Sequence, residues 1–156
     1  MKKSWLLTLV FMICFYKPSE ANDGELSISY ISSHYKPGSM TYCSYGYYAS
    51  KTGDHETAVK IMQNCADVGH LGSMIWLAHM YENGFGVQKD LKHAVELIHR
   101  AAKKGYSIGQ YHYGMALLQG HGVEEDKKAG LSWLNRAASQ GDADAKALLD
   151  KMRYED

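Results

Sequence analysis

Histidine and cysteine are the residues of this sequence with side chains that bind metal ions or attack substrates. The chain has eight histidines and three cysteines. Metal ligands recur at short fixed spacings, such as H-x-x-x-H on a helix or C-x-x-C in a loop. Neither string occurs, and His93 and His99 lie six residues apart. We therefore expect isolated surface histidines, with no metal site and no cofactor.

Two short strings match motifs of enzymes that acylate a serine. Residues 33–36 read SHYK and fit S-x-x-K, and residues 51–53 read KTG. Serine β-lactamases and penicillin-binding proteins use both motifs, with the serine as nucleophile. The intervening S-D-N string of those enzymes is missing, and the chain is too short for their fold. We assign no catalytic residue, and a small hydrolase or β-lactam-binding protein acylated on Ser33 remains an alternative.

Glycine pairs of the form G-x-G occur twice, at residues 84–86 and 120–122. A dinucleotide-binding loop needs a third glycine and a preceding strand. Both are missing, so these glycines are expected to form turns, where they adopt positive φ without steric cost.

The first 21 residues have the three parts of a secretory signal peptide. Lys2 and Lys3 precede an apolar run over residues 5–16, and Ser-Glu-Ala then ends at Ala21. The run is shorter than the ~20 apolar residues that span a bilayer, although a retained membrane anchor is the competing interpretation. We expect cleavage after Ala21 and, from the bacterial style of the signal, a periplasmic or secreted protein.

Removal of residues 1–21 leaves a nearly neutral chain with two cysteines. With 14 basic and 16 acidic residues, its net charge is about −2, too weak to attract nucleic acid or an anionic membrane. Cys14 leaves with the signal, while Cys43 and Cys65 remain. An even count in an oxidising compartment favours a disulfide, and two buried thiols are the alternative. Oxidation argues against Cys43 as a catalytic thiol.

The strongest feature is an internal repeat. Residues 70–105 and 106–141 have equal length and align without a gap, sharing glycines, an aspartate and the string Arg-Ala-Ala. Two apolar series at helical i, i+3, i+4, i+7 spacing predict two helices in the first unit. Their members are Met74, Leu77, Ala78 and Tyr81, then Ala94, Leu97, Ile98, Ala101 and Ala102.

The helix ends follow from capping residues. Asp90 and Asp126 stand where N-caps are needed, and Gly105 and Gly141 stand just beyond the second helices. The predicted organisation is all-α: a right-handed αα-hairpin solenoid with about three repeats, a C-terminal capping helix and seven helices from Met40 onward. Its segments are an N-terminal extended arm or short lead-in helix (22–39), repeats at 40–69, 70–105 and 106–141, and a cap at 142–154.

The two full units resemble the Sel-one-like repeat family, a relative of the tetratricopeptide repeats. The first carries the family pattern at Leu77, Ala78, Tyr81, Gly84 to Val87, Asp90, Ala94, Arg100 to Ala102 and Gly105. The second departs from it at Leu117 and Gly130. The resemblance implies a non-catalytic solenoid that binds a protein on its concave face. Exported members carry a disulfide across each hairpin, and the Cys43 and Cys65 pair resembles a single such case, one residue out of register.

The concave face is expected to be lined by the first helix of each unit. Residues outside the core stripe of those helices are the candidate binding residues: Tyr47, Trp76, His79, Glu82, Asn83, Tyr111, His112 and Met115. Exposed Tyr and Trp make effective binding anchors, although each ring could instead pack against the neighbouring repeat. The predicted protein is a monomeric adaptor or scaffold for another protein, without nucleic acid or stable membrane insertion. An immunity protein that neutralises a delivered antibacterial effector is an alternative.

Overall fold

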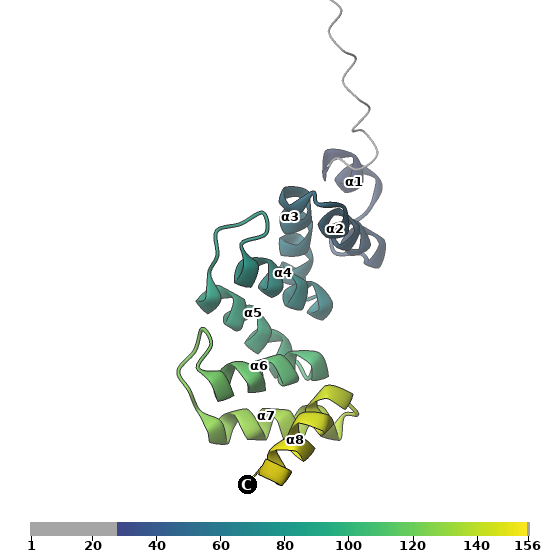
Figure 1. Ribbon diagram of the computed structural model, residues 1–156. Coiled ribbons are helices and arrows are strands. Elements are labelled where there is room, and N and C mark those ends of the chain that lie inside the picture. Colours follow the sequence, from purple (N-terminus) through teal and green to yellow (C-terminus); the bar gives the residue numbers. More distant parts are fainter. Residues whose placement is uncertain (1–27, 156) are drawn as a thin grey trace, which may run out of the picture.

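The computed structural model describes residues 28–155, which form eight α-helices. They are α1 (Ile28–His34), α2 (Met40–Thr52), α3 (His55–Asp67), α4 (Leu71–Asn83), α5 (Leu91–Lys103), α6 (Ser107–Gln119), α7 (Lys127–Ser139) and α8 (Ala143–Glu155). Figure 1 shows them as one elongated stack that begins with α1 and ends with α8. The predicted signal peptide lies outside the described residues. Within them, every helix is too short or too polar to span a membrane.

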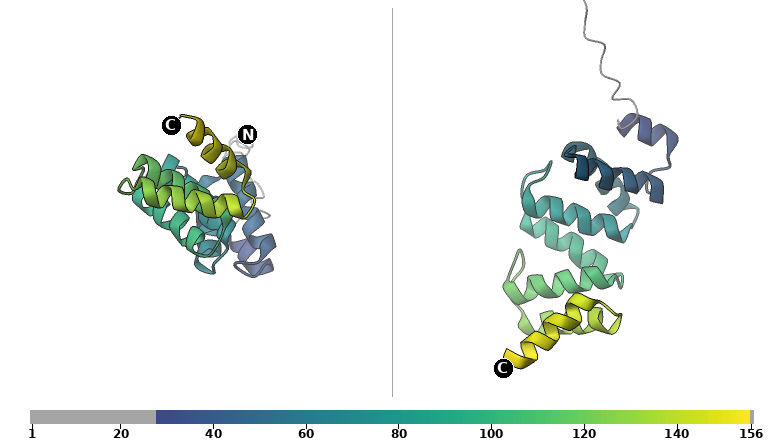
Figure 2. Two further views of the ribbon diagram at one scale, coloured as in Figure 1. Left: turned by 90° about the horizontal axis from the view of Figure 1, so that it is seen from below. Right: turned by 45° about the vertical axis from the view of Figure 1, so that its right-hand side comes forward.

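Neighbours in the chain are neighbours in space. Each helix packs chiefly against the helices before and after it. The pairs α2–α3, α4–α5 and α6–α7 form hairpins, and α8 lies across α7 at the end of the stack (Figure 1, Figure 2). Contacts confined to successive units are the defining feature of a solenoid. The predicted all-helical solenoid of three hairpins and a capping helix is therefore confirmed.

The predicted caps occur at both ends of the helices. The Asp90 carboxylate accepts a hydrogen bond of 3.0 Å from the His93 amide, and the Asp126 carboxylate accepts one of 2.9 Å from the Ala129 amide. Such bonds satisfy backbone donors that the first helical turn leaves free. Gly105 follows α5 with a φ of +86°. The chain therefore begins and ends its central helices where the sequence pattern predicts.

The apolar series of the repeat forms the core. The predicted stripes of α4 and α5 are buried at Met74, Leu77, Ala78, Ala94, Leu97, Ile98, Ala101 and Ala102. Tyr81 is only half-buried and lies edge-on to His93, with ring centroids 4.5 Å apart. In α8, Ala145 is buried against the last hairpin. The buried stripes of α4 and α5 belong to a central core cluster, and smaller clusters lie at the N-terminal and C-terminal ends of the stack.

The N-terminal end is closed by α1 and a disulfide. Residues 28–34, which the sequence left as either extended arm or helix, form α1 and bury Ile31 against the first hairpin. Cys43 of α2 and Cys65 of α3 form a disulfide with Cα atoms 6.0 Å apart. Both cysteines are buried in this same cluster. The first hairpin, which has a repeat on only one side, is thus held by a covalent link.

Candidate protein-binding groove

A groove with a volume of about 480 Å³ runs between α4 and α6, and we term it the α4–α6 groove. Its walls come from the first helices of two successive repeats, and the side chain of Ile98 on α5 contributes to its floor. The lining residues are Gly72, Ile75, Trp76, His79, Glu82, Ile98, Tyr106, Ile108 and His112. Four of the predicted binding residues, those at 76, 79, 82 and 112, therefore line one groove.

A second hollow of about 230 Å³ adjoins the first. It shares Glu82, Ile98 and His112 with the α4–α6 groove, so the two hollows are adjacent. The predicted residues Tyr111 and Met115 line this second part. Tyr111 also packs against the C-terminal core cluster, which means that its ring has a structural contact as well.

Helical periodicity explains why these residues share a surface. In α4, Gly72, Trp76 and His79 follow i, i+4, i+7 spacing and therefore lie on one helix face. The repeat period is 36 residues, so α6 presents Ile108, His112 and Met115 at the equivalent positions. The groove is thus formed by the same face of two consecutive repeats.

The sequence prediction missed the apolar part of the groove, namely Ile75, Ile98, Tyr106 and Ile108. Ile98 was assigned to the core stripe, and it does belong to the core, with only 4% of its surface exposed. Ile108 stands at the position equivalent to Gly72 and is 40% exposed. The helical face that contains His112 and Met115 includes Ile108, so the spacing of the repeat was the signal that could have identified it.

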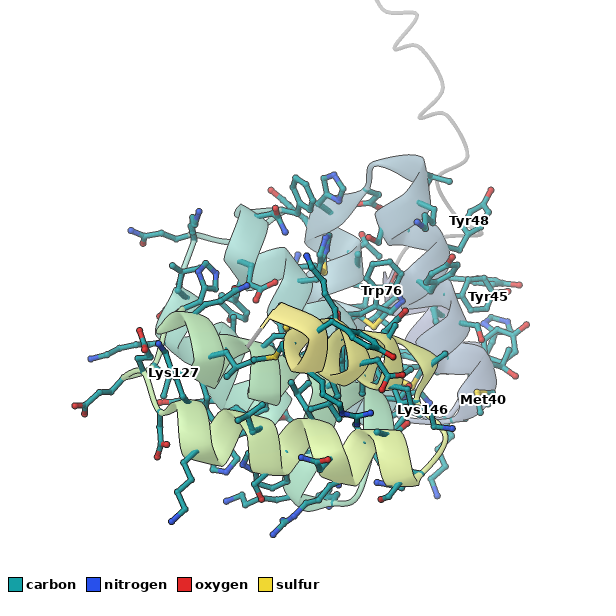
Figure 3. The ribbon with its side chains drawn as sticks, turned by 60° about the horizontal axis from the view of Figure 1, so that its bottom comes forward. Met40, Tyr45, Tyr48, Trp76, Lys127 and Lys146 are labelled. Carbon is teal, nitrogen blue, oxygen red and sulfur yellow. A yellow bond between two sulfur atoms is a disulfide. The ribbon has the colours of Figure 1, made fainter. Side chains whose placement is uncertain are left out.

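Trp76 links the groove to the first repeat. Its ring centroid lies 5.1 Å from that of Tyr47 on α2 and 5.7 Å from that of His79 on α4. The Lys51 ammonium lies over both rings, 5.2 Å from the Trp76 centroid and 5.5 Å from the Tyr47 centroid. In Figure 3, Trp76 lies near the middle of the view, whereas Tyr48 and Lys127 lie at its edges. Tyr47 does not line the groove, but it supports the indole that does.

The His112 end of the groove is acidic. Partial burial lowers the pKa of His112 because it disfavours the charged imidazolium, and the nearby His79 lowers this pKa further. Glu82, Asp142 and Asp144 act in the opposite direction and raise it. Desolvation is the largest of these effects, so the pKa of His112 lies below its ordinary value. Three carboxylates therefore act electrostatically on His112 at this end of the groove.

Two predicted binding residues, Tyr47 and Asn83, line neither hollow. The Asn83 side chain donates a hydrogen bond of 2.8 Å to the backbone carbonyl of His79 and is exposed at the end of α4. Its observed contact is with its own helix, one turn earlier.

The two enzyme-like strings lie in different surroundings. The Ser33 hydroxyl donates to the Tyr30 carbonyl at 2.8 Å and lies 2.9 Å from Nδ1 of His34, all within α1. Lys51 of the second string instead has its ammonium over the rings of α2 and α4. Across residues 28–155, histidine, cysteine and acidic side chains form no group of three or more suited to a metal ion.

Comparison with known proteins identifies the repeat. The family model described as Sel1 repeat matches residues 72–106 and 107–142. A stretch of 65 residues is 37% identical to an exopolysaccharide production negative regulator of Rhizobium leguminosarum bv. viciae. That stretch covers 42% of this chain and only 24% of the regulator. The similarity thus concerns about a quarter of that longer protein.

Solved structures agree with the family match. A Sel1 repeat protein from Oxalobacter formigenes has a TM-score of 0.65 at 28% identity, covering 78% of this chain and 95% of its own. Helicobacter pylori cysteine rich protein B has a TM-score of 0.63 at 22% identity, and the match covers 81% of this chain and 94% of that protein. A protective antigen of uropathogenic Escherichia coli has a TM-score of 0.68 at 23% identity, and the match covers 80% of this chain and 28% of that protein. The last two similarities concern the fold alone. Residues 72–106 and 107–142 of this chain thus match two consecutive Sel1 repeats.

Proposed function

We propose that this protein is a non-catalytic adaptor or scaffold that binds another protein through the α4–α6 groove. Sel1 repeats typically serve as protein–protein interaction modules. The observation that carries the assignment to the groove is the position of Trp76, a half-buried indole beside an apolar floor. Large rings next to a hydrophobic pocket are the usual anchors of protein interfaces.

The groove favours a partner that inserts an apolar side chain. Ile75, Ile98 and Ile108 supply aliphatic surface, and Trp76 supplies an aromatic wall. Covering this surface removes it from water, at about 25 cal/mol for each Å² of apolar area. A single side chain of the partner that contacts both repeats would bury surface on α4 and α6 together.

We also propose that the protein acts outside the cytoplasm, in the periplasm or as a secreted protein. The Cys43–Cys65 disulfide supports this location, because such bonds persist in oxidising compartments. The basic and apolar pattern of residues 1–16 supports it independently. Cell fractionation with N-terminal sequencing tests the proposal. A mature chain that starts at Asn22 outside the cytoplasm is expected, and an uncleaved cytoplasmic chain would contradict it.

Selection from a displayed random-peptide library tests the role of the groove. The bait is residues 22–156, and enriched peptides are measured against wild type, Trp76→Ala and Tyr48→Ala by calorimetry. Tyr48 is the matched control, since it is an aromatic residue on α2 with 51% exposure and it does not line the groove.

The proposal predicts that Trp76→Ala weakens binding of the enriched peptides at least tenfold, which is the loss expected at an interface hot spot. Tyr48→Ala should bind them as wild type does. Equal binding by all three proteins, or an absence of enrichment over a resin control, would contradict the assignment. Far-UV circular dichroism of each variant establishes that the loss is not caused by unfolding.

A further inference from the structure

We infer that the segment of the partner that occupies the α4–α6 groove carries a basic side chain, Lys or Arg, next to its apolar anchor. This inference rests on the proposed function of the groove and adds the chemistry of its partner. It assigns Glu82 as the residue that receives the basic group.

Glu82 is a half-buried carboxylate near the C-terminal end of α4. It lines both hollows beside His112. Among residues 28–155, no lysine or arginine forms an ion pair with it. A partly desolvated carboxylate without a countercharge favours the arrival of a cation, because the two charges then interact where water screens them less.

Two further carboxylates add to the negative potential at this end. Asp142 and Asp144, at the start of α8, both act electrostatically on His112, as Glu82 does. Asp142 is already engaged as a helix cap, since its carboxylate accepts a hydrogen bond of 3.0 Å from the Ala145 amide. Glu82 is therefore the carboxylate best placed for direct contact with a partner, and the two aspartates contribute to the local field.

The opposite edge of the groove repels a basic group. There the Lys51 ammonium lies over Trp76 and Tyr47. Lys51 lies over Trp76 near the middle of α4, whereas Glu82 stands near the C-terminal end of the same helix, and both Trp76 and Glu82 line the groove. A bound segment whose basic residue lies toward Glu82 meets attraction there, and the reverse orientation places its basic residue toward Lys51. The charges thus select the composition and the orientation of the partner segment.

The test uses one peptide enriched by wild type and a second copy in which its Lys or Arg is replaced by Gln. Both are measured by calorimetry at low salt against wild type, Glu82→Gln and the control Glu56→Gln. Glu56 is an exposed carboxylate on α3 that does not line the groove. For wild type and the control, loss of the basic residue should weaken binding about fivefold. With Glu82→Gln, the two peptides should bind with nearly equal affinity.

Two results would overturn the inference and leave the proposed function intact. One is enrichment of groove-binding peptides without basic residues. The other is an equal effect of the peptide change on wild type and on Glu82→Gln. In both cases Trp76→Ala still weakens binding. If Trp76→Ala has no effect, the proposed function itself fails, so the two failures are distinguishable.

Discussion

Gly86 lies directly against the backbone carbonyl of His55, where a Cβ atom at position 86 would come within 2.5 Å of the oxygen. Gly122 of the next repeat meets the carbonyl of Leu91 in the same way. His55 and Leu91 are the first residues of α3 and α5. Each G-x-G loop therefore docks on the start of the second helix in the preceding repeat. The glycines turn the chain and also allow close contact between repeats.

This relationship predicts that Gly86→Ala destabilises the protein more than Gly105→Ala does. Both glycines have positive φ, so each substitution costs about 1 kcal/mol in backbone strain. Only Gly86 has backbone atoms in the way, since a Cβ at Gly105 meets nothing within 4 Å. Overpacking should add about 1–3 kcal/mol at Gly86. Urea unfolding followed by circular dichroism measures both variants, and equal losses would show that the loop does not dock as described.

The disulfide predicts a second stability difference. Cys43 and Cys65 are separated by 22 residues, and a crosslink over that length stabilises by about 3 kcal/mol, mainly by restricting the unfolded chain. Replacing both by Ala should lower the free energy of unfolding by about that amount. Addition of a reductant should lower the melting temperature of wild type but not of the double variant. A reductant-insensitive wild type would be at odds with the disulfide.

The lowered pKa of His112 determines the sign of its pH response. Its ordinary value is 6.5 and its folded value is lower, so the unfolded state binds the proton first as pH falls. The contribution of His112 to stability is therefore complete above pH 6.5 and is lost as pH falls toward the folded pKa. Nuclear magnetic resonance titration of its ring should give a midpoint below 6.5.

Glu82→Gln should lower this midpoint further, because the Glu82 charge raises the pKa of His112. Glu56→Gln is the control and should leave it unchanged. A midpoint above 6.5, or the same midpoint in Glu82→Gln as in wild type, would contradict the described environment of His112.

If Ser33 is a nucleophile, a β-lactam acylates it, whereas a protein that only binds a partner forms no such adduct. A serine acylated by a β-lactam gains the mass of the drug. Because the Ser33 hydroxyl bonds within α1 and Lys51 lies over Trp76, we expect no adduct after incubation with a labelled penicillin. Intact-protein mass spectrometry measures this directly. An adduct that disappears in Ser33→Ala would revive the enzyme interpretation.

The central helices could be predicted because several local signals coincide there. In α5, an apolar stripe starts after a capping aspartate at position 90 and ends before Gly105, and α7 repeats this pattern. α1 lacks such signals. It has only seven residues and one buried side chain, Ile31, so the helix is too short to show a helical period in its apolar residues.

Long-range contacts limited what could be predicted about the groove and the core. Ile75 and Ile108 resemble core residues in sequence, and only the packing of α4 beside α6 makes them groove residues. Gln110 stands where the preceding repeat has Met74, yet it is 5% exposed. It donates to the Ala102 carbonyl at 3.3 Å and accepts a 2.6 Å hydrogen bond from Gln140. Gln140 lies 30 residues away in the sequence, so no local pattern predicts that the buried amide of Gln110 has a hydrogen-bond partner.

The central claim is that a partner binds in the α4–α6 groove, and the two indoles of residues 22–156 test it most directly. Trp76 lines the groove, whereas Trp133 packs with Tyr113 and Arg136 and does not line it. A ¹H–¹⁵N spectrum is recorded while an enriched peptide is added. The account predicts that the Trp76 indole signal moves with saturation and the Trp133 signal stays in place. Movement of Trp133 with an unchanged Trp76 would contradict it.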